Sequence, residues 1–362
     1  MKSRIPASFL IALLLAPPLI GEEASSRVAT PGAPIDYKPL AFQPKSWEAK
    51  GLDTQMLPWT GNEVVFLTTP GTYDGARMAR WLDRLDRGWA LYAGLTGRRP
   101  NPNKLVAGRP VIAAVPSAEL TCGVGCGFVG ATGIELAKFY QEDWTMLEKQ
   151  PEAMPHYAFY EMGRNFYTFG DRHSCFITGY AVFMRYVCMD TLGCADPDQR
   201  TRRVIEEAER GCTASPLGFL DLFTNQGSLS EKQPRLKDST GGWIQPSDQP
   251  VTYASPMLRL RRENGGNDWV RRFFRALAEC PEAKPNNREA ALTQCWHWML
   301  CASLAAGKDL SPIFVGQWRL PVADSTGAAL AKVDWKDPKL TIPVLLQSVH
   351  SEWKRPPAAP DR

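Results

Sequence analysis

The sequence has little net charge, few histidines and, beyond its first 21 residues, no long apolar run. Its 42 Lys and Arg residues nearly balance 38 Asp and Glu residues, which leaves a net charge of +4 over 362 residues. A nucleic-acid partner normally requires a concentrated basic face, so we expect no nucleic acid to bind. A membrane-spanning helix needs roughly 20 apolar residues, and we expect no stable membrane span.

Two further absences narrow the chemistry. The sequence contains no Gly-x-Ser-x-Gly, and no nucleophile with a nearby histidine stands out, so a serine hydrolase is not indicated. With 44% hydrophobic and 22% charged residues, the chain is typical of a globular protein rather than a disordered or collagen-like one.

The N-terminus is typical of a secretory signal over residues 1–21. Lys2 and Arg4 form a basic start, an apolar stretch runs from Phe9 to Ile20, and the small residue Gly21 suits a cleavage site. We therefore expect an exported protein, secreted or located in the periplasm or cell envelope. An uncleaved anchor is the alternative.

Nine cysteines fit an oxidising compartment. Cys122 with Cys126, and Cys194 with Cys212, are close enough in sequence to form disulfides, although spacing alone does not fix the pairing. Because the number is odd, at least one thiol has no partner within the chain. We expect Cys188, inside an apolar run, to be a buried free thiol.

Composition divides the remaining chain into three parts. Residues 22–60, rich in Pro, Ala, Gly and Ser, are predicted to be a linker or arm. A domain follows at 61–335, and a tail at 336–362. Short strands followed mainly by helices predict the α+β class, with a small N-terminal sheet and a mainly helical C-terminal half. The strands are expected at 64–67 and 111–115, and the main helices at 74–93, 158–188 with a break near Gly170, 201–212 and 288–306.

The predicted helix 74–93 is amphipathic, because its apolar residues recur every three or four positions. Its charged residues, among them Arg84 and Asp86, are expected on a solvated face.

The most specific pattern is Phe159-Tyr160-Glu161-Met162-Gly163-Arg164-Asn165-Phe166. In zinc peptidases, His-Glu-x-x-His on a helix places two imidazoles one turn apart to bind Zn²⁺, and the Glu polarises the metal-bound water. Aligned on Glu161, the two ligand positions hold Tyr160 and Arg164. Neither is a usual zinc ligand, and Arg brings a permanent positive charge to the place of the cation. We expect no metal and no other cofactor there.

This pattern resembles the enhancin-like, mucin-active zinc peptidase family, whose helix reads His-Glu-x-Gly-His-Asn-Phe. Glu161, Gly163, Asn165 and Phe166 match, and the resemblance continues through Lys308-Asp309-Leu310-Ser311-Pro312-Ile313-Phe314, Trp318 and Leu320-Pro321-Val322. It covers about residues 60–335 and implies a zincin-like fold. The family's third ligand, a Glu on the next helix, has no counterpart, because residues 176–188 contain no Glu or Asp.

Two alternatives for this helix remain open from sequence. Glu161 is either a general base or hydrogen-bond acceptor in a cleft, or one half of an ion pair with Arg164 or Arg185. A relocated metal site would have to use His156 or His173, which flank the helix. His297 is expected to be a packing or helix-surface residue.

A second motif, Cys122-Gly-Val-Gly125-Cys-Gly127-Phe-Val-Gly130, formally contains Gly-x-Gly-x-x-Gly. It does not open directly from a strand, so we interpret it as a tight cysteine-pinned loop that forms one cleft wall. The residues expected to line or shape the cleft are Tyr160, Glu161, Arg164, Asn165, Glu135, Tyr180 and Arg185.

These observations predict an exported zincin-like domain with a degenerate metal site, which is non-catalytic and binds glycans or glycoproteins. The family resemblance implies the ligand class, and Arg suits acidic groups on sugars. The alternative is an active secreted hydrolase or peptidase that uses Glu161 with a relocated metal or with none. A third reading keeps the fold and gives the cleft an unrelated role, such as envelope assembly or capture of a small ligand.

Overall fold

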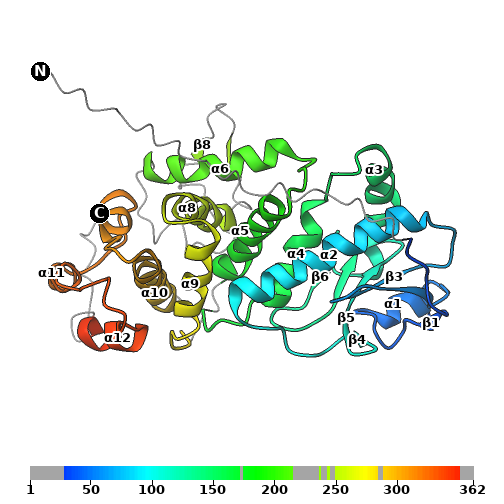
Figure 1. Cartoon of the computed structure of the whole chain (residues 1–362), viewed down its shortest axis with the longest axis horizontal. Coiled ribbons are helices and arrows are strands. Elements are labelled where there is room, and N and C mark those ends of the chain that lie inside the picture. Colours follow the sequence, from blue (N-terminus) through cyan, green and yellow to red (C-terminus); the bar gives the residue numbers. More distant parts are fainter. Residues whose placement is uncertain are drawn as a thin grey trace, which may run out of the picture.

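A mixed sheet, built from the first part of the described chain, occupies one end of the molecule, on the right in Figure 1. The computed structural model describes residues 28–171, 174–214, 236–237, 243–244, 249–283 and 288–350, so the predicted signal segment lies outside it. The strand order is β1-β2-β3-β5-β7-β6, with β4 paired to β5. The strands are β1 (Ile35–Asp36), β2 (Gln55–Thr60), β3 (Val65–Thr68), β4 (Leu105–Val106), β5 (Arg109–Ala114), β6 (Gly125–Gly127) and β7 (Ile134–Leu136).

The centre of the sheet is buried on both faces. Strand β3 runs parallel to β5, and β5 parallel to β7, whereas β6 pairs antiparallel to β7. All four side chains of β3 are buried. Phe66 packs edge-on against Trp81 on one face, while Val65 belongs to a separate apolar cluster on the other. A fully buried apolar strand is expected where both faces of a sheet are covered.

The segment expected as a linker or arm is built into this sheet over its described part. It supplies β1, helix α1 (Pro44–Ala49) and β2, which pairs antiparallel with β3. Tyr37 and Trp47 from this segment are each 1% exposed and pack edge-to-face. The Pro- and Ala-rich composition suggested a linker, but two large aromatic side chains within it anchor the segment to the sheet.

Helix α2 (Gly75–Thr96) matches the predicted helix 74–93. The Asp74 side chain caps its start by accepting a hydrogen bond from the Arg77 amide at 2.6 Å, and Gly97 ends it at φ +66°. The expectation of a solvated charged face is wrong for Arg84 and Asp86, which are both 7% exposed. Asp86 accepts hydrogen bonds from the amides of residues 62–64, and Arg84 donates to the Ala153 carbonyl at 2.8 Å.

Most of the remaining described elements are helices. The predicted helix 158–188 is two helices, α4 (His156–Phe166) and α5 (Ser174–Leu192), and α5 packs between α4 and α8 (Figure 1). The predicted helix 288–306 is α10 (Arg288–Ala306), and the predicted helix 201–212 lies within α6 (Gln199–Ala214). The remaining elements are α3 (Trp144–Lys149), β8 (Leu236–Lys237), β9 (Trp243–Ile244), α8 (Gln249–Glu263), α9 (Asn267–Leu277), α11 (Asp324–Leu330), α12 (Ile342–His350), the single-turn helix η1 (Ala118–Leu120) and two π-helices, η2 (Phe139–Asp143) and η4 (Pro312–Gln317).

The predicted α+β class, with an N-terminal sheet and a mainly helical C-terminal half, is confirmed (Figure 1). The tail expected at 336–362 differs over its described part, because α12 buries Ile342, Leu345 and Val349 completely. Among the described helices, none is long and apolar enough to cross a membrane.

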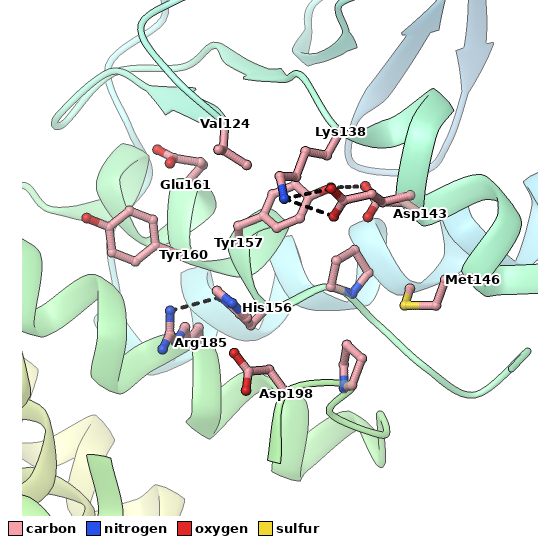
Figure 2. Close-up of a pocket in the computed structure, with 14 residues that line it drawn as sticks. Val124, Lys138, Asp143, Met146, His156, Tyr157, Tyr160, Glu161, Arg185 and Asp198 are labelled. Carbon is pink, nitrogen blue, oxygen red and sulfur yellow. Dashed lines mark hydrogen bonds and ion pairs between the residues drawn. The ribbon is translucent and has the colours of Figure 1, made fainter. Parts of the chain in front are cut away.

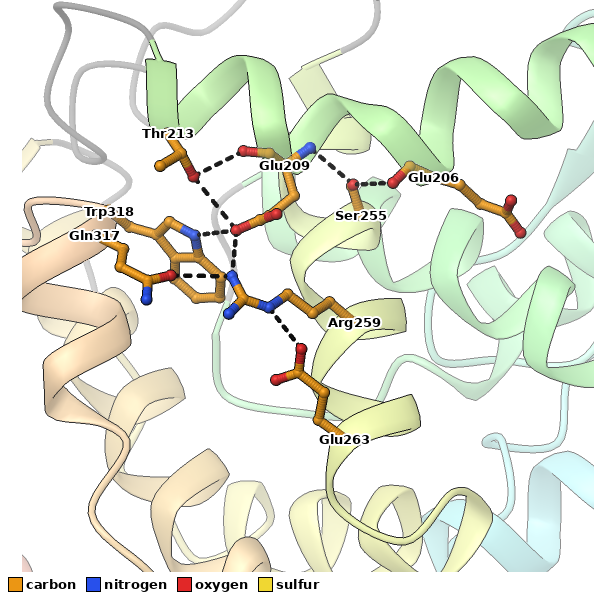
Figure 3. Close-up of polar contacts among 8 residues, drawn as sticks. All are labelled: Glu206, Glu209, Thr213, Ser255, Arg259, Glu263, Gln317 and Trp318. Atoms are coloured by element: carbon orange, nitrogen blue, oxygen red, sulfur yellow. Dashed lines mark hydrogen bonds and ion pairs between the residues drawn. The ribbon is translucent and has the colours of Figure 1, made fainter. Parts of the chain in front are cut away.

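A buried glutamate ties together three elements of the helical half (Figure 3). Oε1 of Glu209, on α6, accepts hydrogen bonds from Nη1 of Arg259 on α8 at 2.6 Å and from Nε1 of Trp318 at 2.8 Å. Trp318 directly follows η4, within the segment that carries the downstream family resemblance. This segment is therefore hydrogen-bonded to both α6 and α8.

The cysteines are only partly as expected. Cys122 and Cys126 form a disulfide, and Cys188 is a fully buried free thiol, so both predictions are confirmed. Cys194 is also a free thiol, so the expected Cys194–Cys212 pairing finds no support. The side chain of Cys212 lies outside the described part of the chain.

Candidate functional site

A pocket of about 600 Å³ opens beside the motif helix α4 (Figure 2). Residues from α4 and α5, from the disulfide loop, from η2 and from the segment before α6 contribute to it. They are Val124, Gly125, Lys138, Glu142, Asp143, Met146, Pro155, His156, Tyr157, Tyr160, Glu161, Arg185, Pro197 and Asp198. The disulfide loop therefore forms one wall, as predicted.

The position of α4 depends on a glycine. A Cβ atom on Gly163 would lie 3.0 Å from the Ala181 Cα on α5, so only glycine lets the two helices approach this closely. On the other side, Tyr92 of α2 donates its hydroxyl hydrogen to the Phe159 carbonyl at 2.7 Å. With α4 fixed in this way, His156, Tyr157, Tyr160 and Glu161 share the face that lines the pocket.

Glu161 is buried against the edge strand β6. Only 5% of the residue is exposed, and a Cβ atom on Gly125 would lie 3.0 Å from the Glu161 Oε1. Burial raises the pKa of Glu161 to about 7, against the opposing effects of the Arg164 charge and the Gly127 amide. Within the described part of the chain, Glu161 makes no ion pair, so the alternative of a pair with Arg164 or Arg185 finds no support there.

His156 and Arg185 form a second polar group in the pocket. Nη1 of Arg185 lies 2.9 Å from Nδ1 of His156, and Arg185 also donates to the Tyr186 hydroxyl at 2.8 Å. Because a guanidinium only donates, Nδ1 of His156 is the acceptor, which places the imidazole proton on Nε2. Burial first, and then the Arg185 charge, lower the pKa of His156 to about 4. The imidazole is therefore neutral at pH 7.

A third polar group faces these two from η2. The Tyr157 hydroxyl donates a short hydrogen bond to Asp143, and Lys138 pairs with Glu142 at 2.7 Å (Figure 2). Burial raises the pKa of Asp143 to about 6, although the bond from Tyr157 acts in the opposite direction. The pocket thus holds two buried carboxyl groups, from α4 and η2, whose pKa values are both raised.

The structure brings together only some of the predicted residues. Tyr160, Glu161 and Arg185 line the pocket, whereas Arg164 is half-buried outside it. Asn165 donates hydrogen bonds to the carbonyls of Phe128 and Gly133 at 3.0 and 3.1 Å, so its amide holds the disulfide loop against α4.

Two of the predicted residues do not line the pocket and are buried in the protein interior instead. Glu135 is completely buried under the N-terminal segment, where it accepts hydrogen bonds from the Tyr37 hydroxyl at 2.7 Å and from the Phe42 amide at 2.9 Å. Tyr180 is fully buried among aromatic rings, including those of Tyr167 and Phe274. The expectation that they line the cleft is wrong, because residues distant in sequence cover both side chains: Tyr37 and Phe42 contact Glu135, and Phe274 packs on Tyr180.

The pocket residues do not suit a zinc ion. Tyr160 and Arg164 stand at the two ligand positions, and in the described ranges no three His, Cys, Asp or Glu residues are grouped to hold a metal. His156, a candidate for a relocated site, has a guanidinium against its Nδ1, which would repel a cation. His297 is buried and faces Asp171 at 3.4 Å, as a packing residue would. His173 and the side chain of His350 lie outside the described residues.

Sequence reasoning missed His156, Tyr157, Asp143, Lys138 and Asp198 as members of one pocket. Two of them carried a usable signal. His156 and Tyr157 precede Tyr160 and Glu161 by four residues each, and residues four apart share one face of a helix. The other three are Asp143 in η2, Lys138 just before η2 and Asp198 before α6, and their approach to α4 is a tertiary feature.

Comparisons with known proteins give structural likeness at low identity. No model of a known protein family matches the chain, and no curated protein does. Among solved structures, the chain is similar to a functionally unknown conserved protein from Bacillus anthracis, with 11% identity, 82% of this chain and 57% of that one covered, and a TM-score of 0.48. It is similar to the ZmpB metallopeptidase from Clostridium perfringens, with 15% identity, 82% and 52% covered, and a TM-score of 0.43.

A metallopeptidase from Bacteroides thetaiotaomicron is similar at 12% identity, with 81% of this chain and 46% of that one covered and a TM-score of 0.42. The chain thus spans about half the length of these three structures.

Proposed function

We propose that this chain is an exported, zincin-like domain without a catalytic metal, and that the pocket beside α4 binds glycans or glycoproteins. The observation that carries the proposal is the composition of the pocket wall. Two half-buried tyrosines, Tyr157 and Tyr160, stand beside the carboxyl groups of Asp143 and Glu161 and the guanidinium of Arg185.

Sugars match such a wall chemically. The apolar face of a sugar ring packs on an aromatic ring, while its hydroxyls exchange hydrogen bonds with carboxylates and guanidinium groups. A pocket with an aromatic surface and a few convergent polar groups is also the usual form of a small-ligand site. Arg185 adds a positive charge that suits a carboxylate or sulfate on an acidic sugar.

The zincin-like assignment and the absence of metal catalysis rest on the same helix. The motif on α4 keeps the Glu, Gly, Asn and Phe of the resembling family, and Gly163 and Asn165 have structural roles that explain their presence. The two ligand positions hold a phenol and a guanidinium. We infer a domain that keeps the family's framework and uses the pocket for binding.

A glycan array probed with the full chain tests this proposal, followed by calorimetry on the retained glycans. We expect Tyr160→Ala to weaken binding by about tenfold, which corresponds to about 1.4 kcal/mol of lost stacking. Glu263→Gln removes an exposed carboxylate on α8 and serves as the control, with affinity unchanged. If the folded wild-type chain retains no glycan, or if Tyr160→Ala binds as tightly, the proposal is wrong.

A hydrolase is the second candidate, and one observation favours it. A carboxyl group with a pKa near 7 in a pocket suits a general acid or base at neutral pH. If the chain hydrolyses mucin-type glycoprotein, Glu161→Gln would abolish product release while leaving substrate binding largely intact. Loss of product release in Glu161→Gln, measured by mass spectrometry, would replace the binding proposal.

A further inference from the structure

Two thiols in the helical half lie side by side, far from the disulfide loop in sequence. Cys280 follows the C-terminal end of α9, and Cys301 lies on the neighbouring helix α10. Their Sγ atoms are 3.5 Å apart. A disulfide requires a separation of about 2.05 Å, so the sulfurs need to approach by only about 1.5 Å.

Other bonds hold these two helices in place. Nε1 of Trp269 donates to the Ala302 carbonyl at 3.3 Å, and Nε of Arg272 donates to the Ala305 carbonyl at 2.7 Å. At the end of α9, the Cys280 amide donates to the Leu277 carbonyl at 3.2 Å, which fixes the backbone of Cys280 relative to its own helix. Two hydrogen bonds between α9 and α10 therefore hold the segments that carry the two thiols beside each other.

The two thiols differ in access. Cys280 is half-buried, whereas Cys301 is completely buried. Burial raises the pKa of the Cys301 thiol, and a neutral thiol is a poor nucleophile. An oxidant from solvent would consequently meet Cys280 first, with Cys301 in place to react second.

We propose that Cys280 and Cys301 form a disulfide when the chain meets a disulfide oxidant, such as oxidised glutathione or the disulfide of a thiol oxidoreductase. The Cys280 thiolate attacks the oxidant's disulfide, forming a mixed disulfide and releasing one thiolate. The Cys301 sulfur, losing its proton, then displaces the second thiol and closes the bond. Two protein thiols are oxidised and one oxidant disulfide is reduced to two thiols.

The bond would fasten the segment just after α9 to the C-terminal half of α10. Oxidation of this pair is independent of any ligand in the pocket, so it can be tested whether or not the glycan proposal holds. By closing a loop of about 20 residues, such a bond is expected to raise the melting temperature by roughly 5–10 °C.

The experiment treats the purified full chain with oxidised glutathione, alkylates it under denaturing conditions, and digests it with trypsin and chymotrypsin without reduction. Chymotrypsin can cut after Trp296 and Trp298, which separates Cys301 from Cys295. We expect a linked peptide joining Cys280 to Cys301, and Cys188 alkylated in full. Full alkylation of both thiols, or Cys280 linked to a different cysteine, would overturn the proposal.

Two variants complete the test. Cys280→Ser changes a half-buried residue, so it is expected to fold, to give no linked peptide, and to show a smaller melting-temperature difference between oxidised and reduced protein than wild type. Cys194→Ser, which changes another half-buried thiol, should keep both the linked peptide and the difference. The Cys122–Cys126 disulfide is present in both variants, so its reduction affects both equally.

Discussion

Two buried glutamates on two helices are treated in opposite ways by this fold. Glu209, on α6, is 8% exposed and accepts hydrogen bonds from Arg259, Trp318 and Thr213 (Figure 3). Glu161, on α4, is 5% exposed and forms no ion pair among the described residues, and no dashed line reaches it in Figure 2. Burying a carboxylate is costly unless it is paired and hydrogen-bonded.

The difference separates a structural carboxylate from an available one. Glu209 joins α6, α8 and the segment after η4 through Oε1, which accepts hydrogen bonds from Arg259 and Trp318. Glu161 opens on a pocket, and its raised pKa records desolvation without a full set of compensating bonds. Such groups are enriched at functional sites. The comparison therefore favours Glu161, rather than Glu209, as a group that meets a ligand.

The largest expected effect comes from breaking the Glu209 cluster. In Glu209→Ala, Nη1 of Arg259 and the indole Nε1 of Trp318 both lose their carboxylate acceptor. Removing one partner of a largely buried pair costs about 3–5 kcal/mol, because the other partner stays desolvated. Urea denaturation should show this loss of unfolding free energy. A loss below about 1 kcal/mol would mean that Glu209 is no more structural than Glu161.

Replacing Glu161 is expected to stabilise the protein at high pH, whereas replacing Glu209 destabilises it. Its pKa is about 7 in the folded protein against 4.5 ordinarily, so the folded state holds a proton that the unfolded state releases. Its contribution to stability is therefore present below pH 4.5, declines as the pH rises to 7, and stays low above that. Glu161→Gln removes the titrating group, and we expect the variant to be more stable than wild type by about 2–3 kcal/mol at pH 8.

Denaturation at two pH values checks this expectation. The advantage of Glu161→Gln should vanish at pH 4, where the wild-type carboxyl group is protonated in both states. A variant that is less stable than wild type at pH 8 would show that Glu161 has a stabilising partner after all, and the contrast with Glu209 would fail.

Local features of this fold could be predicted from the sequence, whereas the surroundings of its charged side chains could not. The α4 motif, the break before α5 and the Cys122–Cys126 disulfide follow from local spacing, and each was predictable. The environment of a charged side chain was not. From sequence, Arg84 and Asp86 were expected on a solvated helix face, yet both are buried. Loops distant in sequence supply a carbonyl that accepts from Arg84 and an amide that donates to Asp86.

Glu135 failed as a cleft residue for the same reason. Its neighbours, Tyr37 and Phe42, come from a segment whose composition suggested a linker. The pocket likewise depends on η2 and the segment before α6 reaching α4. Hydrophobic periodicity predicts helices and strands, while pairing between distant segments depends on the three-dimensional contacts that bury each group.

His156 should show the reverse pH dependence to Glu161. Its pKa is lowered to about 4 by burial and by Arg185, so the unfolded state takes up a proton that the folded state refuses. The contribution of neutral His156 to the unfolding free energy is therefore fully present above pH 6.5, and it is lost as the pH drops toward 4. In His156→Gln the amide oxygen can accept a hydrogen bond from Arg185. Between pH 7 and pH 4.5, the unfolding free energy of this variant should fall by about 2 kcal/mol less than that of wild type. Parallel pH curves for the two proteins would contradict this.

The smallest effect is expected at Glu263, which pairs with the same Arg259 guanidinium as Glu209 but is exposed. Arg259 also pairs through Nε with Glu263 at 2.9 Å, one turn along α8, but that carboxylate is 46% exposed. An exposed pair four residues apart is worth about 0.3–0.5 kcal/mol and weakens with salt. Glu263→Ala should therefore cost no more than this in urea denaturation, and the cost should shrink further in 0.5 M salt. Because Glu209 and Glu263 share one guanidinium, a cost for Glu263→Ala close to that for Glu209→Ala would show that charge, rather than burial, governs the cluster.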